Sequence, residues 1–276
     1  MIRSRRIALV LLLPGLVLLV AGVVIPALTM LLSPPRVSTG EVFDRLGRML
    51  SDPYDLAIIW RTLRIGLTVT GLCLVLGFPT AYLLARSRSR WAGVLLALAI
   101  FPLLLSNVVR TYGWLVVLGR NGVVGQTIEG LGLADPAPQL LYTELAVVLG
   151  LTQLFLPLAI ITCYSAVAQV DANLDEAARG LGAGRMRTLW SVTIPLSMPG
   201  IAMAATLVFA GAVTAYTTPY LLGGSRQTML ATQLFRYSGV SLDWAAASAT
   251  ALIMTVLVLV VYSLSTAITR AKAVSR

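Results

Sequence analysis

Six long apolar stretches, separated by segments with arginine, glycine and proline, dominate the pattern along the chain. Each approaches or exceeds the ~20 residues that an α-helix needs to cross a bilayer. No repeat and no low-complexity stretch is apparent, which favours one transmembrane domain over residues 1–276. We therefore predict an all-α polytopic membrane protein with six transmembrane helices, at about residues 7–32, 65–85, 92–118, 144–168, 200–222 and 245–268.

The first apolar stretch follows Arg3, Arg5 and Arg6 and has two interpretations. A basic start before an apolar run is typical of a signal peptide, but the apolar part of a signal peptide has only about 7–15 residues. This stretch is longer and no clear cleavage pattern follows it, which favours an uncleaved membrane anchor. We expect the mixed segment 36–64 to lie along the outer surface and to lead into the second span.

Composition supports a membrane protein and excludes several kinds of chemistry. Hydrophobic residues make up 58% of the 276 residues and charged residues 12%, against about 25% charged in soluble proteins. The chain has no histidine, so it has no Ser-His or Cys-His pair and no histidine-ligated metal. Its single lysine, Lys272, lies in no phosphate-binding loop. Cys73 and Cys163 lie in apolar stretches and are expected to be packing residues. We predict no catalytic residue, metal site or cofactor.

The distribution of arginine predicts the orientation. With six spans, both termini, the loop near residue 88 and the loop 169–199 share one side, which holds 12 of the 21 basic residues but three of the 11 acidic residues. Basic residues collect in cytoplasmic loops, so both termini are expected in the cytoplasm. The net charge of +10 therefore follows from topology in a lipid membrane and predicts no nucleic-acid partner.

The loop 169–199 contains a predicted helix–turn–helix. Asn173, three residues before Glu176, forms a variant of the capping box and predicts a short helix that starts there. Two glycines can end it, and a second helix is expected over about 185–192. The apolar residues of that second helix share one face and are Met186, Leu189 and Trp190. Such an element can enter a groove on another protein.

This loop resembles that of the inner-membrane permease subunits of binding-protein-dependent ABC importers. Their hallmark is E-A-A, three residues, G, nine residues and I-x-L-P. The chain has Glu176-Ala177-Ala178, Gly182 and Val192-x-Ile194-Pro195 at the same spacing. From about residue 52 onward, further motifs look like the spermidine/putrescine-type branch, namely Pro102, Arg110-Thr111-Tyr112-Gly113-Trp114, Leu221-Leu222-Gly223-Gly224 and Asp243-Trp244.

The resemblance implies a type I ABC importer permease fold in a bacterial inner membrane. It implies four kinds of partner: a cytoplasmic ABC ATPase dimer, a second permease subunit that is normally a different chain, an extracytoplasmic substrate-binding protein and membrane lipid. It also implies which residues couple the loop to the ATPase, namely Glu176, Ala177, Ala178, Gly182 and Pro195, with Glu176 at the contact and Gly182 at the turn. By spacing alone, an equal interpretation is that Glu176 caps its own helix, and the two roles are compatible.

Polar residues within the spans are candidates for lining the translocation path, because lipid makes them costly. They are Arg110, Tyr112 and Trp114 on the third span and Thr214, Tyr216 and Thr217 on the fifth. For Arg110 the alternative is snorkelling to the interface, and for the aromatic residues an interfacial belt. The hydroxyl run before Pro219 suggests a broken helix at a wet cavity, with interhelical hydrogen bonding as the alternative.

Two other classes of function compete with the importer. An ion-coupled secondary transporter usually needs intramembrane acids or histidines, and the spans offer no clear one. An intramembrane hydrolase lacks the histidine of the usual serine dyad. Within the importers, the branch resemblance favours a polyamine such as spermidine or putrescine as the solute. Phosphonate, thiamine and ferric iron stay open as alternatives.

Overall fold

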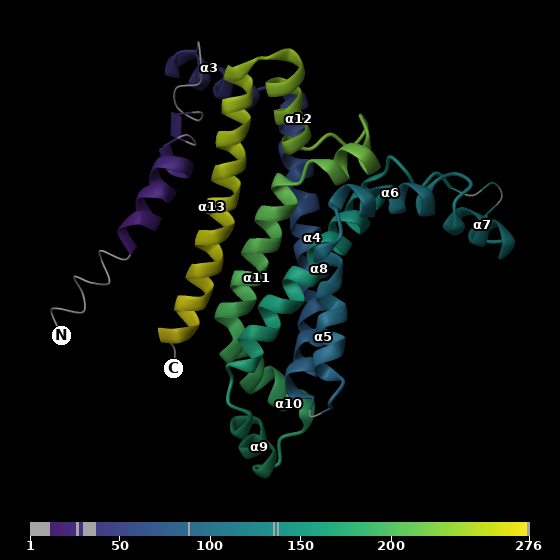
Figure 1. The fold of residues 1–276 in the computed structure, drawn as a ribbon, viewed down its shortest axis with the longest axis vertical. Helices are drawn as coiled ribbons and strands as arrows, with labels where there is room; N and C mark the ends of the chain where they lie inside the picture. Colours follow the sequence, from purple (N-terminus) through teal and green to yellow (C-terminus); the bar gives the residue numbers. More distant parts are fainter. Residues whose placement is uncertain are drawn as a thin grey trace. The chain divides into compact units, whose positions relative to one another are not determined.

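The structure is a computed structural model that describes residues 12–25, 28–29, 37–87, 89–134, 136 and 138–274. Every regular element among these residues is a helix (Figure 1), so the all-α prediction is confirmed. Backbone contacts divide the chain into two units, Met1–Leu56 with Gln233–Thr255 and Ala57–Thr232 with Val256–Arg276. The single membrane domain therefore stays a prediction. The arginines at positions 3, 5 and 6, on which the signal-or-anchor choice depends, lie outside the described residues.

The first unit is built around α3, Thr39–Met49, which the sequence pattern did not predict. Ser38 caps this helix by accepting a hydrogen bond from the N–H of Glu41, and Val42 and Met49 are its buried residues. Asp55 and Gln233 of the same unit are both buried, and the Gln233 side-chain amide donates to the Asp55 carboxylate at 2.7 Å. A buried carboxylate is thus paired within this unit.

The second predicted span lies in a much longer helix, α4, Pro53–Arg86. Residues 39–64 are therefore α3, a turn and the first turns of α4, so the prediction that this segment leads into the second span is confirmed, and its position along the outer surface stays a prediction. The Asp52 carboxylate accepts from the N–H of Tyr54 and Pro53 opens the helix, which are ordinary signals of a helix start. The 34 residues span roughly 50 Å, more than the ~30 Å hydrocarbon layer.

Four described helices are long and apolar enough to cross a membrane: Pro53–Arg86, Glu144–Ala168, Arg185–Thr214 and Trp244–Ala267. A bent pair, Ala92–Leu104 with Asn107–Gly130, would be a fifth span. The described part of the first predicted span is a shorter apolar helix, Leu12–Gly22. The count of six spans therefore stays a prediction.

The helix of the fifth predicted span begins at Arg185 instead of near residue 200. It consists of α10, Arg185–Thr188, a π-helical turn, Leu189–Thr193, and α11, Ile194–Thr214. The second loop helix predicted at 185–192 is thus the start of this helix and not a separate element. The wider π-helical turn lies just ahead of Pro195, whose ring would clash with the carbonyl of residue 191 in a regular helix.

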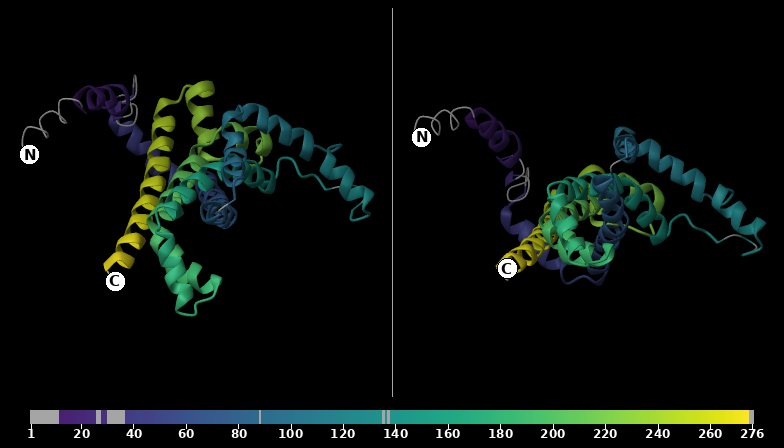
Figure 2. Two further views of the ribbon diagram at one scale, coloured as in Figure 1. Left: turned by 60° about the horizontal axis from the view of Figure 1, so that its bottom comes forward. Right: turned by 90° about the horizontal axis from the view of Figure 1, so that it is seen from below.

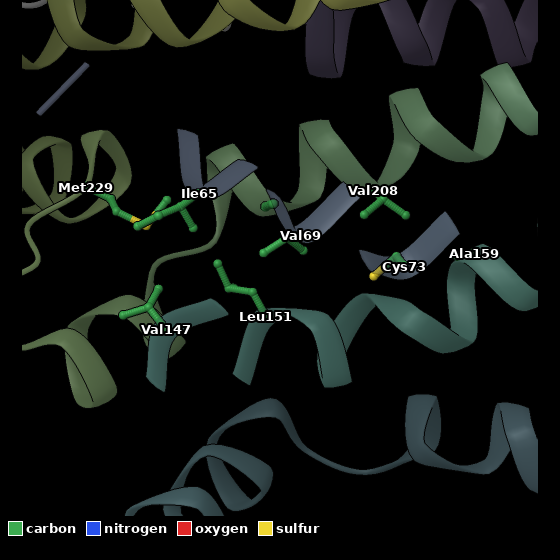
Figure 3. Close-up of a cluster of buried hydrophobic side chains, with 9 residues drawn as sticks. Ile65, Val69, Cys73, Val147, Leu151, Ala159, Val208 and Met229 are labelled. Atoms are coloured by element: carbon green, nitrogen blue, oxygen red, sulfur yellow. The ribbon is translucent and has the colours of Figure 1, made fainter. Parts of the chain in front are cut away.

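The core of the second unit lies among α4, α8 (Glu144–Ala168) and α11. Figure 3 shows Val69 and Cys73 of α4 facing Leu151 and Ala159 of α8 and Val208 of α11. The views of Figures 1 and 2 agree that α8 and α11 run side by side. Gly200 permits this approach, because a Cβ at that position would lie 2.1 Å from the Cβ of Ala166. Both cysteines are free and buried.

Candidate functional site

A short helix, α9, Ala172–Gly180, connects α8 to α10 and lies beyond the end of the α8–α11 pair (Figure 1). Its N-cap is Asp171, whose carboxylate accepts from the N–H of Asn173 at 2.9 Å. The predicted start at Asn173 is therefore late, because the carboxylate two residues earlier already satisfies this N–H group. Glu176 consequently lies in the middle of α9 and is not the partner of a capping box.

Gly182 ends α9 in a left-handed turn. Its φ is +87°, its N–H donates to the carbonyl of Arg179 at 2.9 Å, and the N–H of Ala183 donates to the carbonyl of Ala178 at 3.1 Å. These two bonds form a Schellman motif, in which the C′ residue is usually glycine. The predicted turn at Gly182 is confirmed. We name α9, this turn and α10, residues 172–188, the elbow.

One buried ion pair holds the elbow to the rest of the second unit. The Asp175 carboxylate lies 2.9 Å from Nε of Arg86, the last residue of α4, and their side chains are 7% and 18% exposed. The other Asp175 oxygen accepts from the hydroxyl of Thr193 at 3.0 Å. Arg86 also donates to the carbonyl of Val170 at 3.0 Å. This group, which we call the Asp175 tie, joins α9 to α4 and to the start of the α11 helix.

Sequence reasoning missed the Asp175 tie. Three acids lie close together at residues 171–176, and periodicity alone does not say which of them faces inward. One pattern in the sequence could have indicated the pair. Arg86 lies at the end of one apolar stretch, and Asp175 lies in the next loop that is predicted on the same side of the membrane. The two residues are far apart in sequence, so only the fold brings them together.

The predicted coupling residues lie on and beside the exposed side of the elbow. Glu176 and Ala177 are exposed, Ala178 is half-buried, and Pro195 is half-buried in the first turn of α11. Glu176 borders a cavity of about 660 Å³ whose other lining residues include Arg86, Arg179, Arg185, Met186 and Leu189. Three apolar side chains of the elbow and the adjoining turn are exposed to 91%, 70% and 67%, namely Leu181, Met186 and Trp190. The elbow thus presents apolar groups beside an acidic one.

The third predicted span is broken, so its prediction as one continuous helix is wrong. It consists of α5, Ala92–Ile100, a 3₁₀ turn, Phe101–Leu104, and α6, Asn107–Leu118, and the axis bends by 93°. Pro102 opens the 3₁₀ turn and the backbone is extended at Leu105. After α6 the chain continues into α7, Val123–Gly130, and Figure 2 shows α6 and α7 extending away from α8 and α11.

The three candidates on the third span therefore lie on α6, beyond the bend. Tyr112 is exposed, and Trp114 is half-buried against Leu118, Ala146 and Leu222. Arg110 is half-buried, and its Nε and one Nη are buried without a hydrogen-bond partner among the described residues. Trp114 thus has a packing contact and also lines a cavity of about 360 Å³, and the role of Arg110, Tyr112 and Trp114 in a path stays a prediction.

The fifth span is broken where the sequence predicts it. The α11 helix ends at Thr214, the backbone is extended at Ala215, and a π-helical turn follows over Pro219–Gly223. Thr214 donates to the carbonyl of Ala210 in its own helix, and the Tyr216 and Tyr220 rings stack with centroids 5.2 Å apart. Thr217 is half-buried. The break is confirmed, whereas the role of these residues in a path stays a prediction.

The two breaks meet through Thr218 of the predicted hydroxyl run and two residues of α6 that were not candidates for the path. The hydroxyls of Thr111 and Thr218 lie 3.2 Å apart, and Thr218 also donates to the side-chain carbonyl of Asn107 at 3.5 Å. Asn107 and Thr111 lie in the first turns of α6, and Thr218 directly precedes the turn at Pro219. Interhelical hydrogen bonding, the alternative for the hydroxyl run, therefore holds for Thr218.

These features define a polytopic membrane protein with two interrupted helices and an exposed, firmly held elbow. Residues 74–274 match the family model described as "Binding-protein-dependent transport system inner membrane component". The chain belongs to this family of permeases. No group of three or more His, Cys, Asp or Glu residues within the described ranges is arranged to hold a metal ion.

Individual relatives agree with this membership. The spermidine/putrescine transport system permease protein PotB of Haemophilus influenzae is 32% identical over 208 residues, which are 75% of this chain and 73% of PotB. The molybdenum transport system permease protein ModB of Mycobacterium tuberculosis is 31% identical over 208 residues, 75% of each chain. A bacterial alginate ABC transporter, solved in complex with an alginate-bound periplasmic protein, has the same fold, with a TM-score of 0.74, 18% identity and coverage of 98% and 96%.

Proposed function

We propose that this chain is the permease subunit of an ATP-driven importer and forms half of a translocation path with a second permease, normally a different chain. The observation that carries the proposal is the elbow, which exposes Leu181 and Met186 as well as Glu176, is followed by the exposed Trp190, and is held to the helices by the Asp175 tie. An exposed apolar patch beside polar groups is typical of a protein-binding surface. A rigidly held patch can pass a partner's movement to α4 and α11.

The partner in this proposal is a cytoplasmic ABC ATPase dimer, which hydrolyses ATP that this chain does not bind. Glu176, Ala177 and Ala178 contact the ATPase, Gly182 supplies the turn, and Pro195 starts the helix that carries the movement into the membrane. Both termini and the elbow then lie in the cytoplasm, and an extracytoplasmic binding protein delivers the solute on the opposite side. The candidates for the path remain Arg110, Tyr112, Trp114, Thr214, Tyr216 and Thr217.

The solute we propose is a polyamine of the spermidine/putrescine kind, in line with the name of the PotB relative. A molybdenum oxyanion is the second candidate, because ModB is nearly as similar over the same length. The two solutes carry opposite charge, so one assay separates them.

The solute is tested by reconstituting the permease pair, its ATPase and its binding protein in liposomes. We expect ATP-dependent uptake of radiolabelled spermidine and capture of spermidine by the binding protein. Uptake should stop when the ATPase is inactivated by substitution. Uptake of molybdate alone would overturn the polyamine proposal, and uptake driven by an ion gradient without ATP would overturn the importer itself.

The elbow is tested by replacing Leu181 with aspartate. Its side chain is 91% exposed, so the substitution should change the free energy of unfolding by no more than about 0.5 kcal/mol. A buried apolar anchor in an interface costs about 2 kcal/mol or more when it is lost, so the Kd of the permease for the ATPase should rise about 30-fold and less ATPase should be retained on the purified permease. Leu133→Asp, at a 73% exposed leucine, is the matched control. Equal ATPase retention in both variants would contradict docking at the elbow.

A further inference from the structure

A cavity of about 740 Å³ lies between α8 and α11, at the end of these helices that carries α9. We propose that this cavity is a binding site for alkylammonium groups, which the transported polyamine occupies on its way out of the permease. The proposal rests on the proposed function for the identity of the solute. The preference of the cavity for cations follows from its own lining residues.

Every polar side chain that lines the cavity offers an oxygen that can accept a hydrogen bond, and the one charged group among them is a carboxylate. Asp171 supplies a carboxylate, and the other polar lining residues are Thr162, Ser165, Gln169 and Ser197. The hydroxyls of Thr162 and Ser165 donate to carbonyls one turn earlier in α8, at 2.8 and 2.9 Å. Their lone pairs are therefore the groups left for a ligand, and an ammonium group offers the N–H donors that such oxygens accept.

One polar residue in the wall of this cavity, Ser197, is buried. Its side chain belongs to α11 and is 1% exposed, and its hydroxyl has no hydrogen-bond partner among the described residues. A buried hydroxyl without a partner costs about 1–3 kcal/mol. Because this oxygen is closed to solvent and its hydroxyl can donate as well as accept, Ser197 marks the wall as polar, and the preference for a cation comes from the Asp171 carboxylate.

The charged residues that line this cavity differ from those that line the neighbouring cavity beside Glu176. None of the described residues that line it is arginine or lysine. The 660 Å³ cavity beside Glu176 is lined by Arg86, Arg179 and Arg185. Arg86 does reach the carbonyl of Val170, but its guanidinium lies on that second cavity and is paired with Asp175. An anion entering between α8 and α11 would meet the Asp171 carboxylate and no cation.

The rest of the lining suits a methylene chain. Leu174, Met203 and Leu207 are lining residues with large exposed apolar side chains. A polyamine combines short methylene segments with ammonium groups, and the lining of this cavity combines apolar side chains with hydroxyl and carboxylate oxygens. A molybdenum oxyanion carries neither an ammonium group for the Asp171 carboxylate nor a methylene segment for the apolar side chains. The cavity therefore favours the polyamine over the oxyanion.

The test measures the electrostatic preference of the cavity without depending on transport. In the assembled importer in nanodiscs, Cys73 and Cys163 are replaced by alanine and one cysteine is introduced, as Ser165→Cys in this cavity or Ser87→Cys in the arginine-lined one. Each variant is labelled with a cationic and an anionic methanethiosulfonate of similar size. We expect the cationic-to-anionic rate ratio to be at least about fivefold higher at position 165.

Two further arms identify the responsible group and the ligand. Asp171→Asn keeps an N-cap residue for α9 but removes the charge. It should lower the rate ratio about threefold at position 165 and leave position 87 unchanged. Spermidine at millimolar concentration should slow labelling at position 165 and not at 87.

Equal rate ratios at the two positions, no labelling at position 165 or no protection by spermidine would each overturn the site. A different result would overturn the polyamine as the transported solute without overturning the cavity as a binding site. Cation-selective labelling and spermidine protection in an importer that takes up molybdate and no polyamine would support the alkylammonium site and overturn the polyamine as solute.

Discussion

Replacing Asp175 with leucine is expected to abolish most ATP-dependent uptake and to lower the stability of the permease. The substitution leaves the Arg86 guanidinium, whose side chain is 18% exposed, without its counter-charge, and it removes the acceptor of the Thr193 hydroxyl. Breaking a buried ion pair by removing one partner costs about 3–5 kcal/mol. The thermal unfolding midpoint of the purified protein in detergent measures this loss, and uptake in liposomes measures the function.

A double variant separates coupling from folding. Arg86→Met with Asp175→Leu removes both charges, and apolar replacement of a buried pair is often close to neutral for stability. We therefore expect the double variant to unfold near the native temperature and to bind the ATPase. Its uptake should stay low while ATP hydrolysis continues, because α9 is no longer held to α4. Native uptake by the stable double variant would show that the Asp175 tie serves folding alone.

The matched control is the ion pair of Arg64 and Glu144, which also joins α4 to a neighbouring helix of the same unit. Its side chains are 52% and 31% exposed, and ion pairs of this kind contribute about 0–1 kcal/mol. Glu144→Gln should therefore change both the unfolding midpoint and the uptake much less than Asp175→Leu. A similar loss in both variants would mean that any weakening of α4 contacts impairs uptake.

The apolar stretches predicted the helical class and most spans because lipid imposes a simple rule on length and composition. The rule fails where the helix continues outside the apolar stretch. The helix α4 starts at Pro53 and the α11 helix at Arg185, each more than ten residues before the predicted span. Polar helical turns beyond the bilayer carry no hydropathy signal, so only local start signals such as Asp52-Pro53 reveal them.

The candidate site was predictable as far as local geometry determines it. Gly182 and the break before Pro219 follow from residues that act on their own backbone. The Asp175 tie and the contact of Thr111 with Thr218 depend on partners from distant segments. The bend after Pro102 lies between these cases, since a proline in a span is compatible with a mild kink or a full break, and packing decides.

Replacing Gly182 with valine is expected to lower uptake about tenfold or more while the protein still folds. At φ +87° an L-residue meets its own carbonyl, at a cost of roughly 1–2 kcal/mol, and a β-branched residue fits worse. A Cβ at this position has nothing within 4 Å, so the strain is confined to the backbone. A wider turn at this position rotates α10 relative to α9 and moves Leu181 away from Met186. These are the apolar residues that we propose bind the ATPase.

A graded series tests whether the turn itself is responsible. Uptake should fall in the order Gly182, Gly182→Asn, Gly182→Ala, Gly182→Val, because asparagine tolerates the left-handed region better than alanine or valine does. Gly180→Ala is the matched control, since Gly180 is the last residue of α9 and a Cβ there also meets nothing within 4 Å. It should leave uptake near the native level. If asparagine and valine impaired uptake equally, side-chain bulk at the docking surface, and not the φ of the turn, would explain the loss.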